Sequence, residues 1–124
     1  MNPAKVFTDL LVWQKAHQFV LNVYQYTHNF PKEEMYALTS QFKRAAISVA
    51  ANIAEGFRKK SAKDKMRFYN ISQGSLEECR YYLILANDLS YGENESLSNQ
   101  LEEISKMLNA LIRSIDSKLL KINN

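Results

Sequence analysis

Hydrophobic residues recur at steps of three and four between residues 35 and 57, which is the spacing of one face of an α-helix. This core-facing arc comprises Met35, Leu38, Phe42, Ala46, Val49, Ile53 and Phe57. The same segment is rich in alanine and serine, small residues that let neighbouring helix axes approach closely. We therefore expect a helix over residues 33–57 that packs at the centre of the protein.

Three further segments carry the same helical periodicity, and they predict helices over residues 9–29, 62–90 and 95–122. Their core stripes are Trp13, Ala16, Val20, Val23 and Thr27 in the first, Tyr69, Ser72, Leu76, Cys79, Leu83 and Ala86 in the second, and Leu97, Leu101, Ile104, Leu108, Leu111, Ile115, Leu119 and Ile122 in the third. Short connections between consecutive helices favour antiparallel neighbours. The pattern predicts an all-α, antiparallel up-down-up-down four-helix bundle, with residues 1–124 forming a single domain.

Polar residues at the predicted helix starts support these boundaries. Thr8, Ser61 and Asn94 are the expected N-caps, because their side-chain oxygens can accept a hydrogen bond from a free backbone N–H of the first turn. Pro31 separates the first two helices, since the residue before a proline is pushed away from the helical conformation.

Two glycines receive different interpretations. Gly56 suits the residue just beyond a helix, so we expect the second helix to stop there or to fray through residues 57–60. Gly74 lies in the middle of the third predicted helix, where glycine costs about 1 kcal/mol relative to alanine. We expect another helix to pack closely against Gly74.

A polar stripe lies opposite the core arc of the predicted helix 33–57, and it consists of Gln41, Arg44, Ser48, Asn52 and Glu55. A catalytic interpretation makes Glu55 a general base held by Asn52, but no oxyanion donor or second acid accompanies them. We favour the alternative that the stripe forms hydrogen bonds between helices or subunits and fixes their register. Together with Ile47 and small residues beside it, the stripe predicts a second packing surface.

Residues 30–57 also contain a series of motifs that together are specific. They are Phe30-Pro31, Glu34, Leu38-Thr39-Ser40-Gln41, Arg44-Ala45-Ala46, Ser48-Val49 and Asn52-Ile53-Ala54-Glu55-Gly56. On these residues the chain resembles the four-helix-bundle family encoded in intervening sequences of bacterial 23S rRNA genes. The family often has Gly where this chain has Ala37 and Pro where it has Ala50, which blurs the expected start of the second helix.

The resemblance carries further expectations about assembly and partners. The family's bundle is similar to the pentameric accessory variability protein of diversity-generating retroelements, which works beside a reverse transcriptase. The resemblance therefore implies a ring-like homo-oligomer, with five copies around one axis, and a connection to nucleic acid.

Composition narrows the class of protein. A chain of 124 residues with 46% hydrophobic residues is long and apolar enough to bury a core without disulfides or metals. Cys79 is the single cysteine, so no disulfide can form within the chain. The start of the sequence lacks a basic region followed by an apolar run, and no segment approaches 18 uninterrupted apolar residues. We expect a soluble, cytoplasmic protein without membrane contact.

The usual catalytic and metal-binding motifs are missing from the sequence. No Glu precedes a His by three residues, and His17 and His28 lie 11 residues apart without partnering ligands. A phosphate-binding glycine loop and a nucleophile elbow are also lacking. We expect no metal, no cofactor and no catalytic residue.

Residues 58–67 carry six cations and one acid, although the net charge of the whole chain is only +3. The cations are Arg58, Lys59, Lys60, Lys63, Lys65 and Arg67. Phe57, Phe68 and Tyr69 lie beside them, and such basic segments with aromatic residues bind phosphates and can stack a base. The alternative is a solvated connection that keeps the protein soluble. The family resemblance favours nucleic acid.

The sequence leads to two main functional hypotheses. The first is a homo-oligomeric bundle that binds RNA through charge and shape, with little reading of bases. The alternative is a homo-oligomeric scaffold whose basic connection docks on an acidic protein, and an enzyme is the weakest hypothesis. Several tyrosines cannot all point into one thin core, so they are interface residues or ordinary surface positions; these are Tyr24, Tyr26, Tyr36, Tyr81 and Tyr82.

Overall fold

The computed structural model describes the backbone of residues 3–123 and the side chains of residues 3–117. Its elements are the short 3₁₀ turns η1 (Phe7–Asp9) and η2 (Lys32–Glu34) and the helices α1 (Leu11–Thr27), α2 (Leu38–Arg58), α3 (Ala62–Asp88) and α4 (Glu95–Asn123). Residues 3–123 contain no β-strand. The all-α prediction is confirmed.

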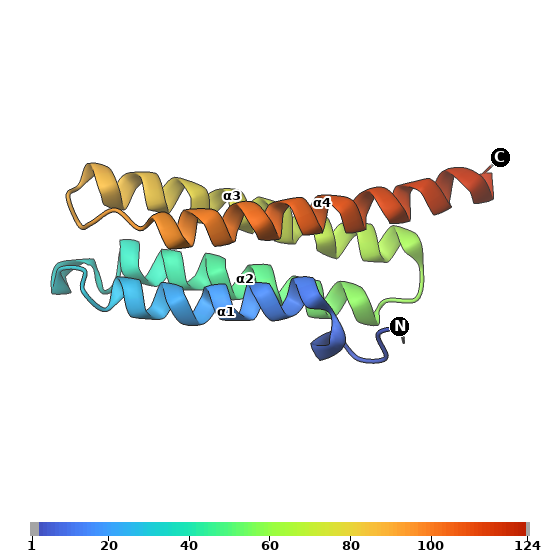
Figure 1. Cartoon of the computed structure of the whole chain (residues 1–124), viewed down its shortest axis with the longest axis horizontal. Coiled ribbons are helices and arrows are strands. Elements are labelled where there is room, and N and C mark those ends of the chain that lie inside the picture. The colour runs from blue at the N-terminus through green and yellow to red at the C-terminus, as the bar shows by residue number, and fades with distance from the viewer. Residues whose placement is uncertain (1–2, 124) are drawn as a thin grey trace.

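The four helices form an elongated antiparallel bundle (Figure 1). Helix α1 packs against α2 and α4, and α3 packs against α2 and α4, with the most extensive contact between α2 and α3. The α1–α2 and α3–α4 connections lie at one end of the bundle, and the α2–α3 connection lies at the other end, on the same side as both chain ends. The predicted up-down-up-down topology is therefore correct.

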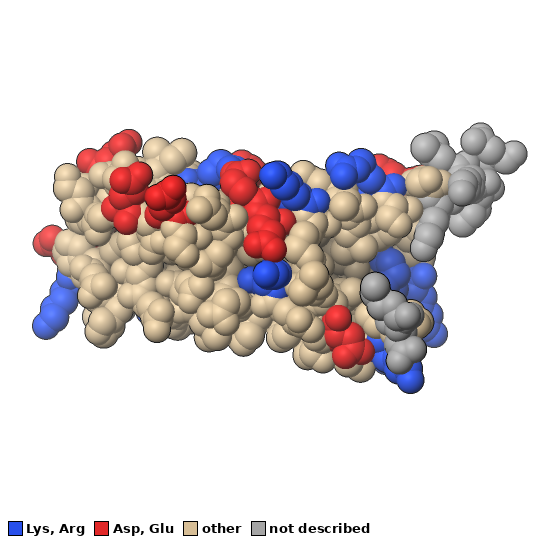
Figure 2. Space-filling view, viewed as in Figure 1, with Lys and Arg blue, Asp and Glu red and all other residues tan. Residues whose placement is uncertain are grey.

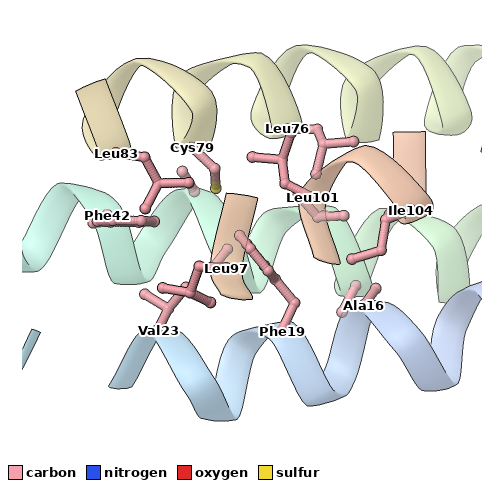
Figure 3. Close-up of a cluster of buried hydrophobic side chains, with 14 of the residues drawn as sticks. Ala16, Phe19, Val23, Phe42, Leu76, Cys79, Leu83, Leu97, Leu101 and Ile104 are labelled. Atoms are coloured by element: carbon pink, nitrogen blue, oxygen red, sulfur yellow. The ribbon is translucent and has the colours of Figure 1, made fainter. Parts of the chain in front are cut away.

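The core stripes expected for α3 and α4 are the ones the bundle buries (Figure 3). All six stripe residues of α3 are buried, and so are Leu97, Leu101, Ile104, Leu108 and Ile115 of α4, while Leu111 is half-buried. Leu119 and Ile122 lie outside the described side chains. In α2 the core arc is buried from Leu38 to Ile53.

The core face of α1 is slightly rotated from the predicted one: Ala16, Val23 and Thr27 are buried as expected, but Trp13 and Val20 are not fully buried. Val12 and Phe19 are buried there, whereas Trp13 and Val20 are half-buried on the flank. Both stripes advance in steps of three and four and share Ala16, Val23 and Thr27, so periodicity alone does not separate them. The packing of α1 between α2 and α4 selects the stripe that contains Phe19.

The first helix also begins two residues later than expected, because Thr8 is not its N-cap. The carboxylate of Asp9 accepts hydrogen bonds from the backbone N–H groups of Lys5 (3.0 Å) and Val6 (3.2 Å). These bonds fold Phe7–Asp9 into η1, which packs against α1 and α2. The ring of Phe7 thereby meets that of Trp13 edge to face, with centroids 5.0 Å apart.

Helix α2 starts at Leu38 and not at residue 33. The N–H of Glu34 donates to the carbonyl of Pro31 over 2.9 Å and that of Met35 donates to Lys32 over 3.1 Å, which gives 3₁₀ turns in place of α-helix. Ala37 then adopts φ −123° and ψ −108°, outside the helical region. Met35 is consequently exposed and does not belong to the core arc.

The close helix contact expected at Gly74 is found at Gly56 instead, and α2 continues past Gly56 into the range 57–60 where it was expected to fray. Gly56 does not end α2, which runs on to Arg58, and it lies buried inside the helix. A Cβ atom at Gly56 would come within 2.6 Å of Cε1 of Tyr69, so α3 packs directly against this glycine. Gly74 is exposed and has no atom within 4 Å of an added Cβ, so the expected close contact there is wrong.

Two of the three predicted N-caps are confirmed. The hydroxyl of Ser61 accepts a hydrogen bond from the backbone N–H of Asp64 over 3.1 Å. The side-chain oxygen of Asn94 accepts one from Leu97 over 2.9 Å. These bonds satisfy free donors in the first turns of α3 and α4.

Candidate nucleic-acid interface

The basic segment lies at the end of the bundle that carries the α2–α3 connection. Figure 2 shows cationic side chains gathered there, whereas acidic side chains gather towards the opposite end, where α4 begins. Arg58 is the last residue of α2, Lys59 and Lys60 lie in the connection, and Lys63, Lys65 and Arg67 follow in the first turns of α3. One tight connection thus brings all six cations to one end of the molecule.

Lys65 folds back onto the end of α2. Its ammonium donates to the backbone carbonyls of Gly56 (3.2 Å) and Phe57 (2.7 Å) and lies 5.4 Å from the centroid of the Phe57 ring. The last carbonyls of a helix lack intrahelical donors and form the negative end of the helix dipole. Lys65 therefore satisfies the C-terminus of α2 and joins it to α3.

Lys59 and Arg67 lie over the ring of Phe68. The Lys59 ammonium is 5.0 Å from the ring centroid and 3.9 Å from a carboxylate oxygen of Glu55, while the Arg67 guanidinium is 5.5 Å from the centroid. Cations attract the negative face of an aromatic ring at such distances. Lys59 and Lys65 are half-buried, whereas the other four cations of residues 58–67 are exposed.

The other four cations are exposed to solvent, although the Arg67 guanidinium also lies against the Phe68 ring. Arg58, Lys60, Lys63 and Arg67 are all exposed. Within the described part of the chain, none of the four forms an ion pair. Four exposed cations that form no ion pair among the described residues therefore lie in one short segment, with Asp64 as its single acid, and such a segment attracts phosphate groups.

The polar stripe of α2 divides into two parts. Ser48 and Asn52 lie at the α2–α3 contact, where Asn52 Nδ2 donates to the carbonyl (2.9 Å) and hydroxyl (3.0 Å) of Ser48. The hydroxyl of Ser75 from α3 completes this cluster with a 2.7 Å bond to the Ser48 hydroxyl. The sequence predicted a close helix contact at Gly74, and a contact with α2 lies at the adjacent Ser75, whose partner Ser48 could not be identified from the sequence.

The remaining stripe residues do not join this cluster. Gln41, Arg44 and Glu55 are exposed, and Glu55 pairs with Lys59. Asn52 directs its amide to Ser48 and not to Glu55, so the geometry lacks the bond that would hold Glu55 as a general base.

A shallow apolar groove runs along the side of the bundle formed by η1, α1 and α2. It is lined by Phe7, Trp13, His17, Val20, Ile47, Ala50, Ala51 and Ala54. None of these lining residues is acidic or a lysine or arginine. The His17 ring stacks on Trp13 with centroids 5.1 Å apart. The sequence predicted the apolar second face of α2, but not the contribution of Phe7, which depends on the η1 turn.

The single cysteine is not a candidate nucleophile. Cys79 is buried in the core, and this burial, with a smaller contribution from Glu78, raises the pKa of its thiol to about 12. The reactive thiolate is therefore almost unpopulated at neutral pH. Among the described residues, no three side chains of the metal-binding types His, Cys, Asp and Glu come together. In the same part of the chain, no helix has the length and hydrophobicity needed to cross a lipid bilayer.

Comparison with known proteins gives a consistent family assignment. The model of the 23S rRNA-intervening sequence protein family matches residues 8–110. A similar solved structure is the 1.70 Å crystal structure of a protein of unknown function from the S23 ribosomal protein family of Bacteroides thetaiotaomicron VPI-5482. It has a TM-score of 0.76 and 26% sequence identity, and the match covers 83% of this chain and 96% of the other. No curated protein matches the chain. Because the family model spans most of the sequence, the chain belongs to the 23S rRNA-intervening sequence protein family.

Proposed function

We propose that this protein is a non-enzymatic, cytoplasmic homo-oligomer that binds RNA through the basic connection between α2 and α3. The observation that supports RNA binding is the set of four exposed cations without ion pairs in the described residues, Arg58, Lys60, Lys63 and Arg67. Each cation that contacts a phosphate releases condensed counterions, which favours binding in dilute salt. The family name links these proteins to 23S rRNA genes and does not name a ligand.

RNA binding is tested by measuring the affinity of the purified protein for fluorescently labelled RNA as a function of salt. We expect log affinity to fall linearly with log salt, with a slope of about −0.7 for each phosphate contact to a single strand. Neutralising all six cations of residues 58–67 should weaken binding and flatten this slope while the circular dichroism spectrum stays helical. If the wild-type protein shows no salt-dependent binding at low ionic strength, the connection is a solvated loop and the protein-scaffold alternative takes precedence.

The apolar groove supports the homo-oligomeric part of the proposal. A surface lined by aromatic and small apolar side chains and lacking acidic, lysine and arginine residues fits an apolar partner surface. We propose a second copy of this chain as the occupant, because the chain presents further exposed apolar side chains, among them Leu21, Ile71 and Ile84. The groove contains none of the four exposed cations, although its residue Ala54 lies one helical turn before Arg58. The expected count of five copies comes from the resemblance and stays a prediction.

A further inference from the structure

The basic connection uses its six cations in two different ways. We infer that Lys59 and Lys65 hold the connection in shape, and that Arg58, Lys60, Lys63 and Arg67 bind RNA through its phosphate groups without preference for the base. This inference rests on the proposed RNA-binding function. It assigns the residues and the part of the ligand that they recognise.

Lys65 is already committed to the protein backbone. Its ammonium donates to the carbonyls of Gly56 and Phe57 at distances of 3.2 and 2.7 Å. A phosphate that captured Lys65 would leave these two carbonyls at the end of α2 without that donor. Binding RNA through Lys65 would therefore break hydrogen bonds that connect α3 to the end of α2. Binding through the exposed cations leaves these hydrogen bonds intact.

Lys59 has a counter-charge of its own. Its ammonium lies 3.9 Å from the carboxylate of Glu55, so the pair presents little net charge to a phosphate. The same ammonium sits 5.0 Å from the centroid of the Phe68 ring. Capture by RNA would separate Lys59 from both the carboxylate and the ring, whereas among the described residues Lys60 has neither contact and Arg67 has only the ring contact.

The two aromatic rings of the connection are not open platforms for bases. Lys65 lies over Phe57, and both Lys59 and Arg67 lie over Phe68. Stacking a base needs an accessible ring face. Because the protein's own cations lie over these rings and both rings are half-buried, the connection offers no open ring on which a base could stack. Contact with RNA is then left to the phosphates, which carry no base identity.

The four remaining cations are arranged to follow a phosphate backbone. Lys63 and Arg67 are four residues apart in α3, so their side chains project from the same face of the helix. Arg58 and Lys60 lie on the other side of the Ser61 cap, at the end of α2 and in the connection. The Lys65 bonds and the Ser61 cap fix this frame, so the charges are presented by an ordered surface.

The test measures salt-dependent binding of labelled oligouridylate and oligoadenylate of equal length. Arg58→Gln, Lys60→Gln, Lys63→Gln and Arg67→Gln are each expected to reduce the slope by about 0.7, and the fourfold variant should abolish most of the salt dependence. Lys65→Met and Lys59→Met should keep the wild-type slope, and Lys65→Met should lower the thermal unfolding midpoint. Lys106→Gln on α4 is the matched control for removing an exposed cation elsewhere, and it should change neither quantity.

The outcomes separate this assignment from the proposed function. If the wild-type protein binds but Lys65→Met or Lys59→Met flattens the slope as much as Lys60→Gln does, the division into two groups is wrong. Lys59→Met keeps the Lys65 bonds to α2, so it gives an answer even if Lys65→Met fails to fold. A tenfold or larger preference for oligoadenylate would overturn base-independent binding. Absence of any binding by the wild-type protein refutes RNA binding itself, and with it this assignment.

Discussion

At the scale of single residues, Gly56 and Gly74 meet opposite surroundings inside their helices. A Cβ at Gly56 would lie 2.6 Å from a ring atom of the buried Tyr69, whereas the space around Gly74 is open. Gly56→Ala should therefore destabilise the protein by about 1–3 kcal/mol through overpacking. Gly74→Ala, the matched control, should stabilise it by about 0.4–1 kcal/mol, because alanine favours the helix and restricts the unfolded chain. Urea unfolding of the two variants measures both effects.

A Gly56→Ala variant as stable as the wild type would show that the Tyr69 ring has room to move. Sequence reasoning could not assign these roles, because the helical periodicity places both glycines inside or near a helix without saying which one faces a large ring. Phe19 illustrates the same difficulty, because the predicted stripe with Val20 and the observed stripe with Phe19 both follow helical spacing. The packing of α1 against its neighbours decides which of the two is buried, and a single sequence does not contain that information directly.

Ionisation of the buried Cys79 thiol should lower the free energy of unfolding in alkaline solution. Burial, followed by Glu78, raises the pKa of the thiol from 9.0 to about 12. The folded protein therefore holds the proton more tightly than the unfolded chain above pH 9, so this contribution to stability is complete below pH 9 and is lost as the pH rises toward 12. The loss is at most about 1.4 kcal/mol for each pH unit.

The measurement compares urea unfolding of the wild type and Cys79→Ala between pH 8 and pH 11. Buried Tyr69 also has a raised pKa and titrates in both proteins, so it largely cancels in the difference between the two curves. Burial raises the pKa of Tyr82, with a smaller contribution from Cys79, so the difference reports the thiol together with this minor effect on Tyr82. We expect the difference in unfolding free energy between the two proteins to be constant up to about pH 9. Above pH 9 the wild type should lose stability relative to Cys79→Ala. Parallel curves over the whole range would contradict a thiol pKa this high.

At the scale of the elements, the starts of the helices differ in how well the sequence reveals them. Helices α3 and α4 begin after Ser61 and Asn94, whose side chains form the expected capping bonds. Helices α1 and α2 begin after Leu10 and Ala37, neither of which forms a side-chain capping bond. A helix start can be predicted from the sequence when a local side-chain hydrogen bond caps the helix. Where a 3₁₀ turn comes before the helix and no such bond forms, the sequence does not reveal the first helical residue.

An alanine-to-leucine substitution should have different consequences on the two faces of α2. Ala46 is fully buried in the core and Ala51 is exposed in the apolar groove. Ala46→Leu should overpack the core and destabilise the protein by about 1–3 kcal/mol. Ala51→Leu should leave the free energy of monomer unfolding nearly unchanged and alter assembly instead. Chemical denaturation at low protein concentration measures the first effect, and an unchanged midpoint for Ala46→Leu would mean that the core has unfilled space at this position.

At the scale of the whole molecule, three surfaces are made of different residues. The cations of residues 58–67 occupy one end and acidic side chains gather towards the other (Figures 1 and 2). The apolar groove is lined by residues of η1, α1 and α2 and reaches Ala54, one helical turn before Arg58. The sequence predicted the basic segment and the small-residue face because each is contiguous or periodic. It did not predict the internal bonds of Lys65, because these depend on the tight turn that brings α3 back against the end of α2. Because the groove and the exposed cations are made of different residues, separate substitutions can test self-association and RNA binding.

Self-association is the last prediction, and the groove supplies a direct way to test it. Ile47 is 43% exposed and lines the groove, so Ile47→Glu places a charge in the proposed contact without entering the core. Burying that unpaired carboxylate in an apolar interface is costly, and the variant should be monomeric while its helical content is unchanged. Asn99→Glu adds the same charge at an exposed position of α4 and should assemble like the wild type. Multi-angle light scattering at micromolar concentration measures the mass of each protein. A monomeric wild type would refute self-association, an oligomer with another number of copies would refute only the expected pentamer, and an oligomeric Ile47→Glu would place the contact on a different face.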